Sequence, residues 1–497
     1  MSEMEARAEV ARKGTRRAGA RGTACALFGM SMCATLAYST VSRGAGLYFS
    51  DRGVRPLGRG GAFVAGADDL GAVWYNPAGL ADAGTSLMAD FAWLNFSSEY
   101  TRRTQVADAN GTLRVYESGQ VKGSTPVLPI PTLGGTFNFG KEKEWTLALA
   151  AFAPYTAIAS YPLTVDGGQP SPSRYLLVSL DGSALVVTGA WLAWKPIEEL
   201  RVGVGVEALV GTFDSTVVFS ASPQDRLIGA PEDPNYDAFS KLKVGPIFAP
   251  SANAGVTFVP DKHVRLGVSG QLPFSIDAPA TITVRLPNAP EFDRASQQGD
   301  EAHVKFTLPA IFRAGIELRQ GFGAAGDLRV EATYVREMWT THHSIDIVPD
   351  NIKLLNVTGF PSPFAVSPIS IARNFDNANS VRLGAEYFGH AGGYGLTARL
   401  GINYEQSAIP RAYLSPLTLD LNKVTASIGG SLHVGKHWRL DAVYAHVFTG
   451  DATVDPAEAA VPRVNPVKGN PTAGEAVNGG LYSARADVVG VGVNYRF

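Results

Sequence analysis

The chain has 497 residues, of which 45% are hydrophobic and 18% are charged, and its formal net charge is −2. A mean hydropathy of +0.03 argues against a bundle of membrane-spanning helices. The mildly acidic balance, without a basic stripe, argues against nucleic acid as a partner. The length fits two or three soluble domains or one very large barrel.

Residues 1–42 have the features of a cleavable signal peptide. A basic cluster at residues 12–21 precedes the apolar run Thr23–Val41, which ends in small residues. A retained anchor helix is the alternative. Cys25 and Cys33 both fall inside this segment, so the mature chain would have no disulfide or thiolate metal site. Without this segment the chain has 37 Lys+Arg against 42 Asp+Glu, a net charge of −5.

The next segment, residues 43–84, is rich in glycine and alanine and fits neither a strand nor a long helix. Its glycines permit close backbone packing, and Asn76-Pro77 forces an extended turn before any further helix. Short helical pieces, such as one over Ala62–Ala67, are expected between these breaks. The sequence therefore predicts a small compact plug.

Beyond Thr85 the dominant pattern has a period of two. In the final strand, Val489, Val491 and Val493 alternate with small or polar residues up to the terminal Phe497. Such a strand has its polar face toward water in a soluble sandwich, whereas in a transmembrane barrel its apolar face contacts lipid. About fourteen candidate strands have roughly ten residues each, the length that a tilted strand needs to cross a bilayer.

These strands are expected to start near Thr85, Pro131, Trp145, Ala184, Leu200, Ala249, His263, His303, Asp327, Ser380, Gly395, Val424, Lys436 and Ala486. The alternation is weakest near Pro131 and Ala249, which leaves counts of twelve and sixteen open. The connections are alternately tight and long, and the long ones are 98–130, 214–248, 336–379 and 448–485. Alternating lengths are typical of barrels with periplasmic turns and extracellular loops. We therefore predict an all-β transmembrane barrel of about 14 antiparallel strands over residues 85–497.

Several segments resemble one known family. They are the wording Gly-x-Gly-Gly-Ala, Ala-Asp-Asp and Asn-Pro-Ala-Gly-Leu within residues 58–80, and the segments Phe152–Tyr155, Val381–Tyr387 and Gly401–Pro410. The first group closely resembles the N-terminal hatch of FadL/TodX-type transporters. The others resemble strand segments of that family, although Tyr155-Thr156 departs from its pattern. Members of the family are outer-membrane channels for long-chain fatty acids and other hydrophobic molecules.

The resemblance implies passive uptake of hydrophobic compounds such as long-chain fatty acids across a Gram-negative-type outer membrane. A ligand is gathered at an outer loop groove and passes to a pocket in the lumen. A hatch rearrangement and a lateral gap at a kinked third strand then release it into the bilayer. The implied partners are outer-membrane lipid and a fatty acid or aromatic hydrocarbon. No cofactor is expected, and the protein is expected to be a monomer.

Seven residues are candidates for ligand binding or for hatch function. They are Phe63, Trp74, Asn76, Pro77, Ala78, Arg265 and Arg313. Phe63 and Trp74 either present an apolar surface to the ligand or pack the plug against the wall. Asn76 is expected to cap or turn the chain before Pro77. Arg265 and Arg313 either belong to a structural salt-bridge lining that holds the hatch or bind a substrate carboxylate in a bidentate manner.

An enzyme and a metal site are not expected. His342-His343 with Ser344 and Asp346 match no known nucleophile motif. The pair Asp68-Asp69 lacks calcium-loop spacing, which favours a solvated turn or a helix cap. Two other functions remain open. A general porin for polar solutes would lack a plug, and a non-transporting barrel would use its long loops for adhesion or scaffolding.

Overall fold

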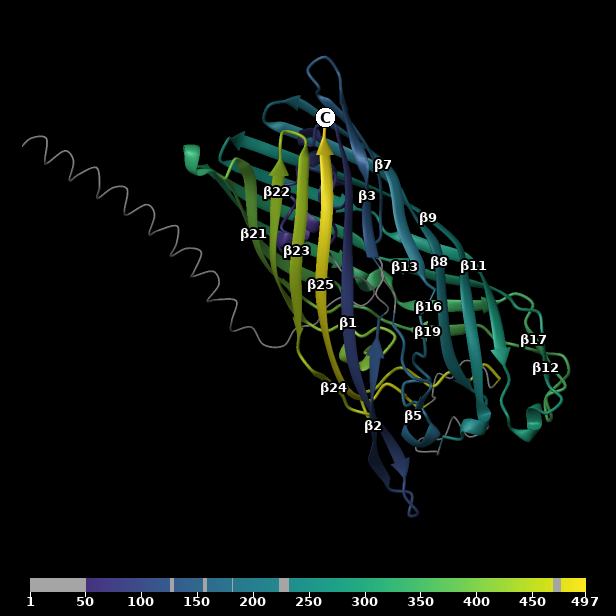
Figure 1. The fold of residues 1–497 in the computed structure, drawn as a ribbon. Helices are drawn as coiled ribbons and strands as arrows, with labels where there is room; N and C mark the ends of the chain where they lie inside the picture. The colour runs from purple at the N-terminus through teal and green to yellow at the C-terminus, as the bar shows by residue number, and fades with distance from the viewer. Residues whose placement is uncertain (1–50, 126–128, 155–158, 181, 223–231, 468–474) are drawn as a thin grey trace, which may run out of the picture. The chain divides into compact units, whose positions relative to one another are not determined.

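The computed structural model describes residues 51–125, 129–154, 159–180, 182–222, 232–467 and 475–497 (Figure 1). The predicted signal peptide, the first residues of the predicted hatch and the Tyr155-Thr156 pair lie outside the described residues. In the described part of the chain, every helix is too short or too polar to cross a membrane.

Fourteen antiparallel strands close into a barrel within the described residues. Closure is made by β1 (Ser86–Ala107) and β25 (Gly480–Arg496), which pair continuously from Ser86–Arg496 to Arg102–Gly480 and lie side by side in Figure 1. Between them the wall contains β3 (Pro129–Phe139), β4 (Trp145–Phe152), β7 (Ala184–Ile197), β8 (Leu200–Ser220), β9 (Asp237–Asp261), β10 (Val264–Gln271), β14 (Ala310–Gly321), β15 (Asp327–Met338), β20 (Ala378–Ala391), β21 (Tyr394–Glu405), β22 (Lys423–Val434) and β23 (Trp438–Thr449). The predicted barrel is confirmed, and the weak candidates near Pro131 and Ala249 are β3 and β9.

The long connections contain strands, of which the sequence predicted only the one near His303. That strand is β13 (Glu301–Leu308), and the wall strand β14 follows it. β1 and β8 continue beyond the wall because they keep hydrogen-bonding partners there, in β2 (Leu113–Ser124) and in the first half of β9. Further strands in these connections are β11 (Phe274–Arg285), β16 (Ser344–Pro349) and β19 (Ile369–Ala372), with the short β5 (Thr164–Val165), β6 (Gln169–Pro170), β12 (Ser296–Gln298), β17 (Lys353–Leu355), β18 (Phe364–Ala365) and β24 (Ala452–Val454). The short 3-10 turns are η3 (Asp166–Gly168), η4 (Pro234–Tyr236), η5 (Pro290–Phe292), η6 (Gly323–Ala325), η7 (Trp339–Thr341) and η8 (Arg411–Tyr413). The parts of the connections 98–130 and 214–248 that lie outside strands are therefore shorter than predicted.

The outer face of the wall is apolar, as the period of two predicts. On β25, the side chains of Val489 and Val491 are 50% and 48% exposed, whereas that of Val488, which faces the lumen, is fully buried. Near the end with the short turns, aromatic side chains pair on the wall. The ring centroids of the stacked Trp145 and Trp194 are 5.2 Å apart, and those of Trp438 and Tyr495 are 4.7 Å apart. An apolar band with an aromatic border is the surface that a lipid bilayer requires.

Residues 51–84, hereafter the plug, are almost entirely buried and pack against the inner face of the wall. They form α2 (Val54–Gly58), α3 (Ala72–Tyr75) and the 3-10 helix η2 (Pro77–Asp82). Asn76 is extended, and its side chain accepts a hydrogen bond from the N–H of Ala78 at 3.2 Å, so it caps η2. The helix expected over Ala62–Ala67 is wrong, because the backbone N–H groups there bind a wall carboxylate instead of upstream carbonyls.

Candidate functional site

The wall carboxylate that binds the N–H groups of residues 64–66 belongs to Glu331, which lies on β15 and is fully buried. It accepts hydrogen bonds from the N–H groups of Val64, Ala65 and Gly66 at 2.6, 2.8 and 3.0 Å. Arg59 of the plug also donates to it at 3.0 Å. Charge-assisted bonds of this kind are about twice as strong as neutral ones. Glu331 therefore binds three consecutive N–H groups in the middle of the plug.

Wall glycines allow the plug backbone to approach closely. A Cβ atom added to Gly401 of β21 would lie 2.0 Å from the nitrogen of Gly60, and one added to Gly203 of β8 would lie 2.3 Å from the carbonyl carbon of Pro77. A Cβ at Gly267 of β10 would lie 2.6 Å from the carbonyl oxygen of Val64. No side chain fits at such distances. The plug is therefore in direct backbone contact with several strands.

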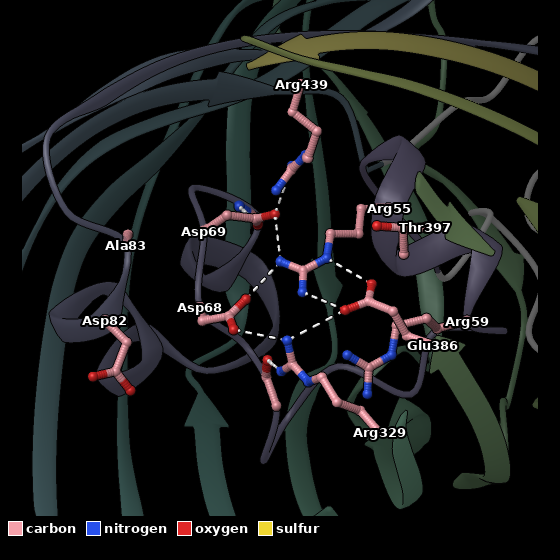
Figure 2. Close-up of polar contacts among 12 residues, drawn as sticks. Arg55, Arg59, Asp68, Asp69, Asp82, Ala83, Arg329, Glu386, Thr397 and Arg439 are labelled. Carbon is pink, nitrogen blue, oxygen red and sulfur yellow. Dashed lines mark hydrogen bonds and ion pairs between the residues drawn. The ribbon is translucent and has the colours of Figure 1, made fainter. Parts of the chain in front are cut away.

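A network of ion pairs centred on Arg55 lies between α2 and the rest of the plug (Figure 2). Arg55 binds Glu386 of β20 through two nitrogens at 2.9 and 2.8 Å, which is a bidentate pair. Its third nitrogen lies 2.5 Å from Asp68 and 3.1 Å from Asp69. The interpretation of Asp68-Asp69 as solvated is wrong, because both carboxylates bind arginines. The turn is present at Asp69, whose side chain accepts a hydrogen bond from the N–H of Gly71 at 3.0 Å, just before α3.

The wall supplies further cations to the same network. Arg329 of β15 binds Asp68 at 2.8 Å and donates to the carbonyl of Gly66 at 2.6 Å, and Arg439 of β23 binds Asp69 at 3.0 Å. At the end of the plug, Arg265 of β10 binds Asp82. The network therefore ties the plug to the wall at several separate strands.

The predicted residues Arg265 and Arg313 occupy different surroundings. Arg265 donates to Asp82 at 2.6 Å and to the carbonyl of Ala65 at 3.0 Å, so a ligand carboxylate bound there would have to displace Asp82. The guanidinium of Arg313 lies 4.6 Å from the ring centroid of Trp74. Both arginines thus contact the plug. Such contact is what the first of their two predicted roles, a structural lining that holds the hatch, requires.

Among the predicted plug residues, the aromatic ones lie inside an apolar cluster of the bore. Trp74 contacts Phe152 of β4 edge-on at 5.7 Å, and Phe152 lies 6.2 Å from Trp191 of β7. Phe63 packs edge-on against Tyr75 at 5.7 Å. Pro77 and Ala78 are buried against β8. Trp74 therefore joins the plug to the end of β4.

The wall changes at this point. The pairing of β4 with β3 and β7 ends at Phe152. In the described residues 159–180 that follow, pairing consists of isolated bridges such as Ser160–Ser179 and of the short β5–β6 hairpin. The N–H of Ala153 still donates to Pro131, at 3.3 Å. The side chain of Arg52, near the start of the described plug, donates to the carbonyl oxygen of Pro154. The first turn of the plug thus contacts the segment where regular wall pairing stops.

Two cavities have contrasting linings. One, of about 660 Å³, lies at the short-turn end and is lined by charged side chains such as Lys262, Arg319 and Arg496. The other, of about 60 Å³, lies among the long connections and is lined mainly by apolar side chains such as Phe219, Phe292 and Ile369. The two cavities therefore offer opposite environments.

Asp68→Asn should loosen the plug at pH 7 but not in strong acid. Burial raises the pKa of Asp68, but the charges of Arg329, Arg55 and Arg319 outweigh it and hold the pKa well below its ordinary value. A depressed pKa stabilises the folded state above the unfolded value of about 4, and this stabilisation is lost as the pH falls through the folded value. Ion conductance in planar bilayers should thus be higher for the variant at pH 7 and pH 5.

The two proteins should become equal only well below pH 4. Asp277→Asn is the matched control, because this exposed carboxylate pairs with Lys305 outside the plug. A conductance difference that stays constant down to the strongest acid would contradict the assignment of Asp68.

Comparison with known proteins agrees with this geometry. Residues 35–497 match the family model described as outer membrane protein transport protein (OMPP1/FadL/TodX). A Pseudomonas aeruginosa FadL homologue is similar in structure, with a TM-score of 0.63 and 16% identity over 91% of this chain and 100% of that chain. The Pseudomonas putida toluene transporter TodX gives a TM-score of 0.61 and 14% identity over 90% and 99%. The Ralstonia pickettii toluene transporter TbuX gives 0.54 and 16% over 90% and 99%.

A search of curated proteins found no match. The solved structures share the barrel fold of this chain, and the family model covers most of its length. The predicted family, fold class and outer-membrane location are therefore confirmed. The chain belongs to the OMPP1/FadL/TodX family of outer-membrane transport proteins.

Proposed function

We propose that this protein is a passive channel for hydrophobic compounds such as long-chain fatty acids, which leave it sideways into the outer membrane. The observation that carries the proposal is the contrast between the two exits from the bore. The short-turn end, which is periplasmic by the usual topology of such barrels, opens into a cavity lined by charge. At the end of β4, aromatic side chains meet a wall whose regular pairing has stopped.

The proposed path starts at the extracellular end. The cavity lined by Phe219, Phe292 and Ile369 offers an apolar surface to a ligand that arrives from outside. The path continues through the apolar cluster of the bore to Trp74 and Phe152. An apolar ligand loses its favourable environment if it moves on into the charged cavity, whereas it keeps one if it enters the bilayer.

The plug is proposed to act as the hatch, which extends over residues 43–84 and follows a signal peptide at residues 1–42. Phe63 and Trp74 present its apolar surface, while Asn76, Pro77 and Ala78 fix η2 against the wall. Several family relatives are named as toluene transporters, so an aromatic hydrocarbon is the second class of ligand to test. Release of the ion pairs with β15, β20 and β23 would let the plug move without unfolding the barrel.

Purified protein in liposomes tests the function directly. Wild type should transfer oleate and toluene into the membrane phase without ATP or an ion gradient, and it should pass neither a disaccharide nor a steady ion current. Steady ion conductance with disaccharide passage would favour a general porin instead. Failure to transfer either hydrophobic compound, with the barrel folded by circular dichroism, would support a non-transporting barrel.

Pro154→Val tests lateral release. A proline has no N–H to donate, so Pro154 helps to stop wall pairing beyond Phe152, and valine would allow β4 to continue. We expect a severalfold slower transfer of oleate into the bilayer. Pro250→Val is the matched control, because Pro250 lies in β9 opposite Ala208, where pairing is continuous. Equal transfer by wild type and both variants would count against an exit at β4.

A further inference from the structure

The wall above the end of β4 is closed by a mostly irregular segment instead of by regular strands. In this segment, residues 159–180, hereafter the panel, Ser160 bridges Ser124 of β2, and Ser179 bridges both Ser160 and Thr216 of β8. In the part of the chain that the structure describes, this row of single bridges is the β-pairing that spans from β2 to β8 above β3, β4 and β7. An isolated bridge holds far less backbone than a ladder, so the panel is a weakly joined part of the wall.

The panel is attached more weakly on its β2 side than on its β8 side. On the β8 side, four backbone hydrogen bonds of 2.7–3.2 Å join it to Thr216 and Val218. On the β2 side, the described residues form only two backbone bonds, exchanged with Ser124 at 2.9 and 3.0 Å. The hydroxyls of Tyr161 and of Ser98 in β1 share one further bond at 2.7 Å. The β2 side is therefore the seam at which the panel separates more easily.

One carboxylate bridges this weaker seam. Glu232, in the connection between β8 and β9, binds Arg174 of the panel at 2.9 Å and also binds Arg102 of β1. A third arginine, Arg463 of the connection between β24 and β25, lies 3.3 Å from the same carboxylate. The side chains of the three arginines are only 1–7% exposed. Glu232 therefore links the panel to β1 across the seam, and to one further connection.

An aromatic ring and a second carboxylate complete this cluster. The guanidinium carbons of the three arginines lie 4.2–5.8 Å from the ring centroid of Tyr175, a distance that allows cation–π attraction. Asp237 of β9 binds Arg174 at 2.7 Å and accepts a hydrogen bond from the hydroxyl of Tyr175 at 2.6 Å. Among the described carboxylates, Glu232 is the one that contacts all three arginines. The cluster thus depends on Glu232 to oppose the mutual repulsion of three cations.

The charge of Glu232 is secured by its surroundings. Burial raises its pKa, but the charges of Arg102, Arg174 and Arg463 outweigh burial and lower the pKa to about 2. The carboxylate is therefore ionised at pH 7. Without it, three buried cations would repel one another around a single ring, and removing one partner of a buried ion pair is strongly unfavourable. Loss of this carboxylate is thus expected to drive the panel away from β1.

We propose that the panel is a movable part of the wall above the β4 exit and that Glu232 is the latch that holds its β2 side shut. This inference rests on the proposed function and deepens it, because it names the segment that must move for a ligand to leave at the end of β4. Gly182 suits the hinge, since it lies between the panel and β7 and has a φ of +88°, which glycine adopts readily. Glu232 is a positioning residue: it acts through the panel and needs no contact with the ligand.

A reversible disulfide across the seam tests whether the panel moves. Ser124 and Ser160 exchange two N–H···O bonds, and the Cα atoms of such a pair are about 5.5 Å apart, which a disulfide can span. Oxidised Ser124→Cys with Ser160→Cys should transfer oleate into liposome membranes severalfold more slowly, and dithiothreitol should restore the wild-type rate. The chain's own two cysteines lie in the predicted signal peptide, so only the introduced thiols should react. Ala332→Cys with Leu383→Cys, in the continuous β15–β20 ladder, is the matched control and should change nothing.

Glu232→Gln tests the latch. Glutamine keeps the shape of the side chain and loses its charge, so the panel should open more often. Hydrogen exchange at the panel amides should be about tenfold faster, and oleate transfer severalfold faster, with an unchanged barrel by circular dichroism. Glu99→Gln makes the same change at an exposed pair with Lys122 on the neighbouring hairpin, and neither rate should change there.

The outcomes separate this inference from the channel proposal. Unchanged oleate transfer by the oxidised double-cysteine protein would overturn the movable panel and leave the channel proposal intact. Equal exchange at the panel amides of Glu232→Gln and wild type would overturn the latch. If wild type transferred neither oleate nor toluene, the proposed function itself would fall, whereas the exchange experiment would still decide the role of Glu232.

Discussion

Gly401→Val is expected to expel the plug and convert the barrel into an open pore. The Cβ of any larger residue at this position would lie 2.0 Å from the backbone nitrogen of Gly60, and backbone cannot move aside as a flexible side chain can. Overpacking typically costs about 1–3 kcal/mol, and a backbone contact places this variant at or above the upper end. Ion conductance in planar bilayers should rise from almost zero to a steady current.

The barrel itself should survive this change, because β21 keeps both of its ladders, with β20 and β22. Gly270→Val is the control: this glycine is on the outer face of β10, and the nearest atom to an added Cβ is 3.9 Å away. Its conductance should equal that of wild type. A closed Gly401→Val barrel with unchanged amide protection in the plug would show that the contact is not rigid.

Glu331→Leu is expected to release the middle of the plug. The substitution leaves three backbone N–H groups at Val64, Ala65 and Gly66 without an acceptor in a buried site. Unsatisfied buried donors cost about 1–3 kcal/mol each, and partial relaxation limits the total to on the order of 3–5 kcal/mol. Hydrogen exchange followed by mass spectrometry should show loss of protection in the peptide that contains these amides.

Two further variants show whether the loss of the buried acceptor causes the release of the plug. Glu331→Gln keeps an acceptor oxygen and loses only the charge, so its effect should be smaller than that of leucine. Glu117→Leu makes the same chemical change at a half-exposed ion pair with Arg103 in the β1–β2 hairpin, where about 1 kcal/mol or less is expected. Equal exchange in Glu331→Leu and wild type would mean that wall packing alone fixes the plug.

The barrel was predictable because its signal is local. Each wall strand alternates between lipid and lumen, so a face such as that of Val489 and Val491 is visible in a few consecutive residues. The loop strands were not predictable in the same way. β16 and β19 are short, separated by a long connection, and stabilised by a partner whose register no local pattern specifies.

The site was predictable only in part for the same reason. The glycine-rich composition predicted a compact plug, and Asn76 before Pro77 predicted its turn. The partners of Arg55 could not be predicted from the sequence. Glu386 is 331 residues away along the chain and becomes a neighbour of Arg55 only in the folded barrel. The helix expected over Ala62–Ala67 failed because Glu331, far along the chain, supplies the acceptors that a helix would otherwise provide.

The pairing of β1 with β25 has a consequence for how the protein is made. Both edges of this junction come from opposite ends of the sequence, so the cylinder cannot close until the last strand has been synthesised. The plug backbone lies directly against wall glycines such as Gly401, so we do not expect it to enter the bore after closure. We therefore expect the sheet to close around a stopper that is already in position, and a glycine variant such as Gly401→Val to close around an empty bore.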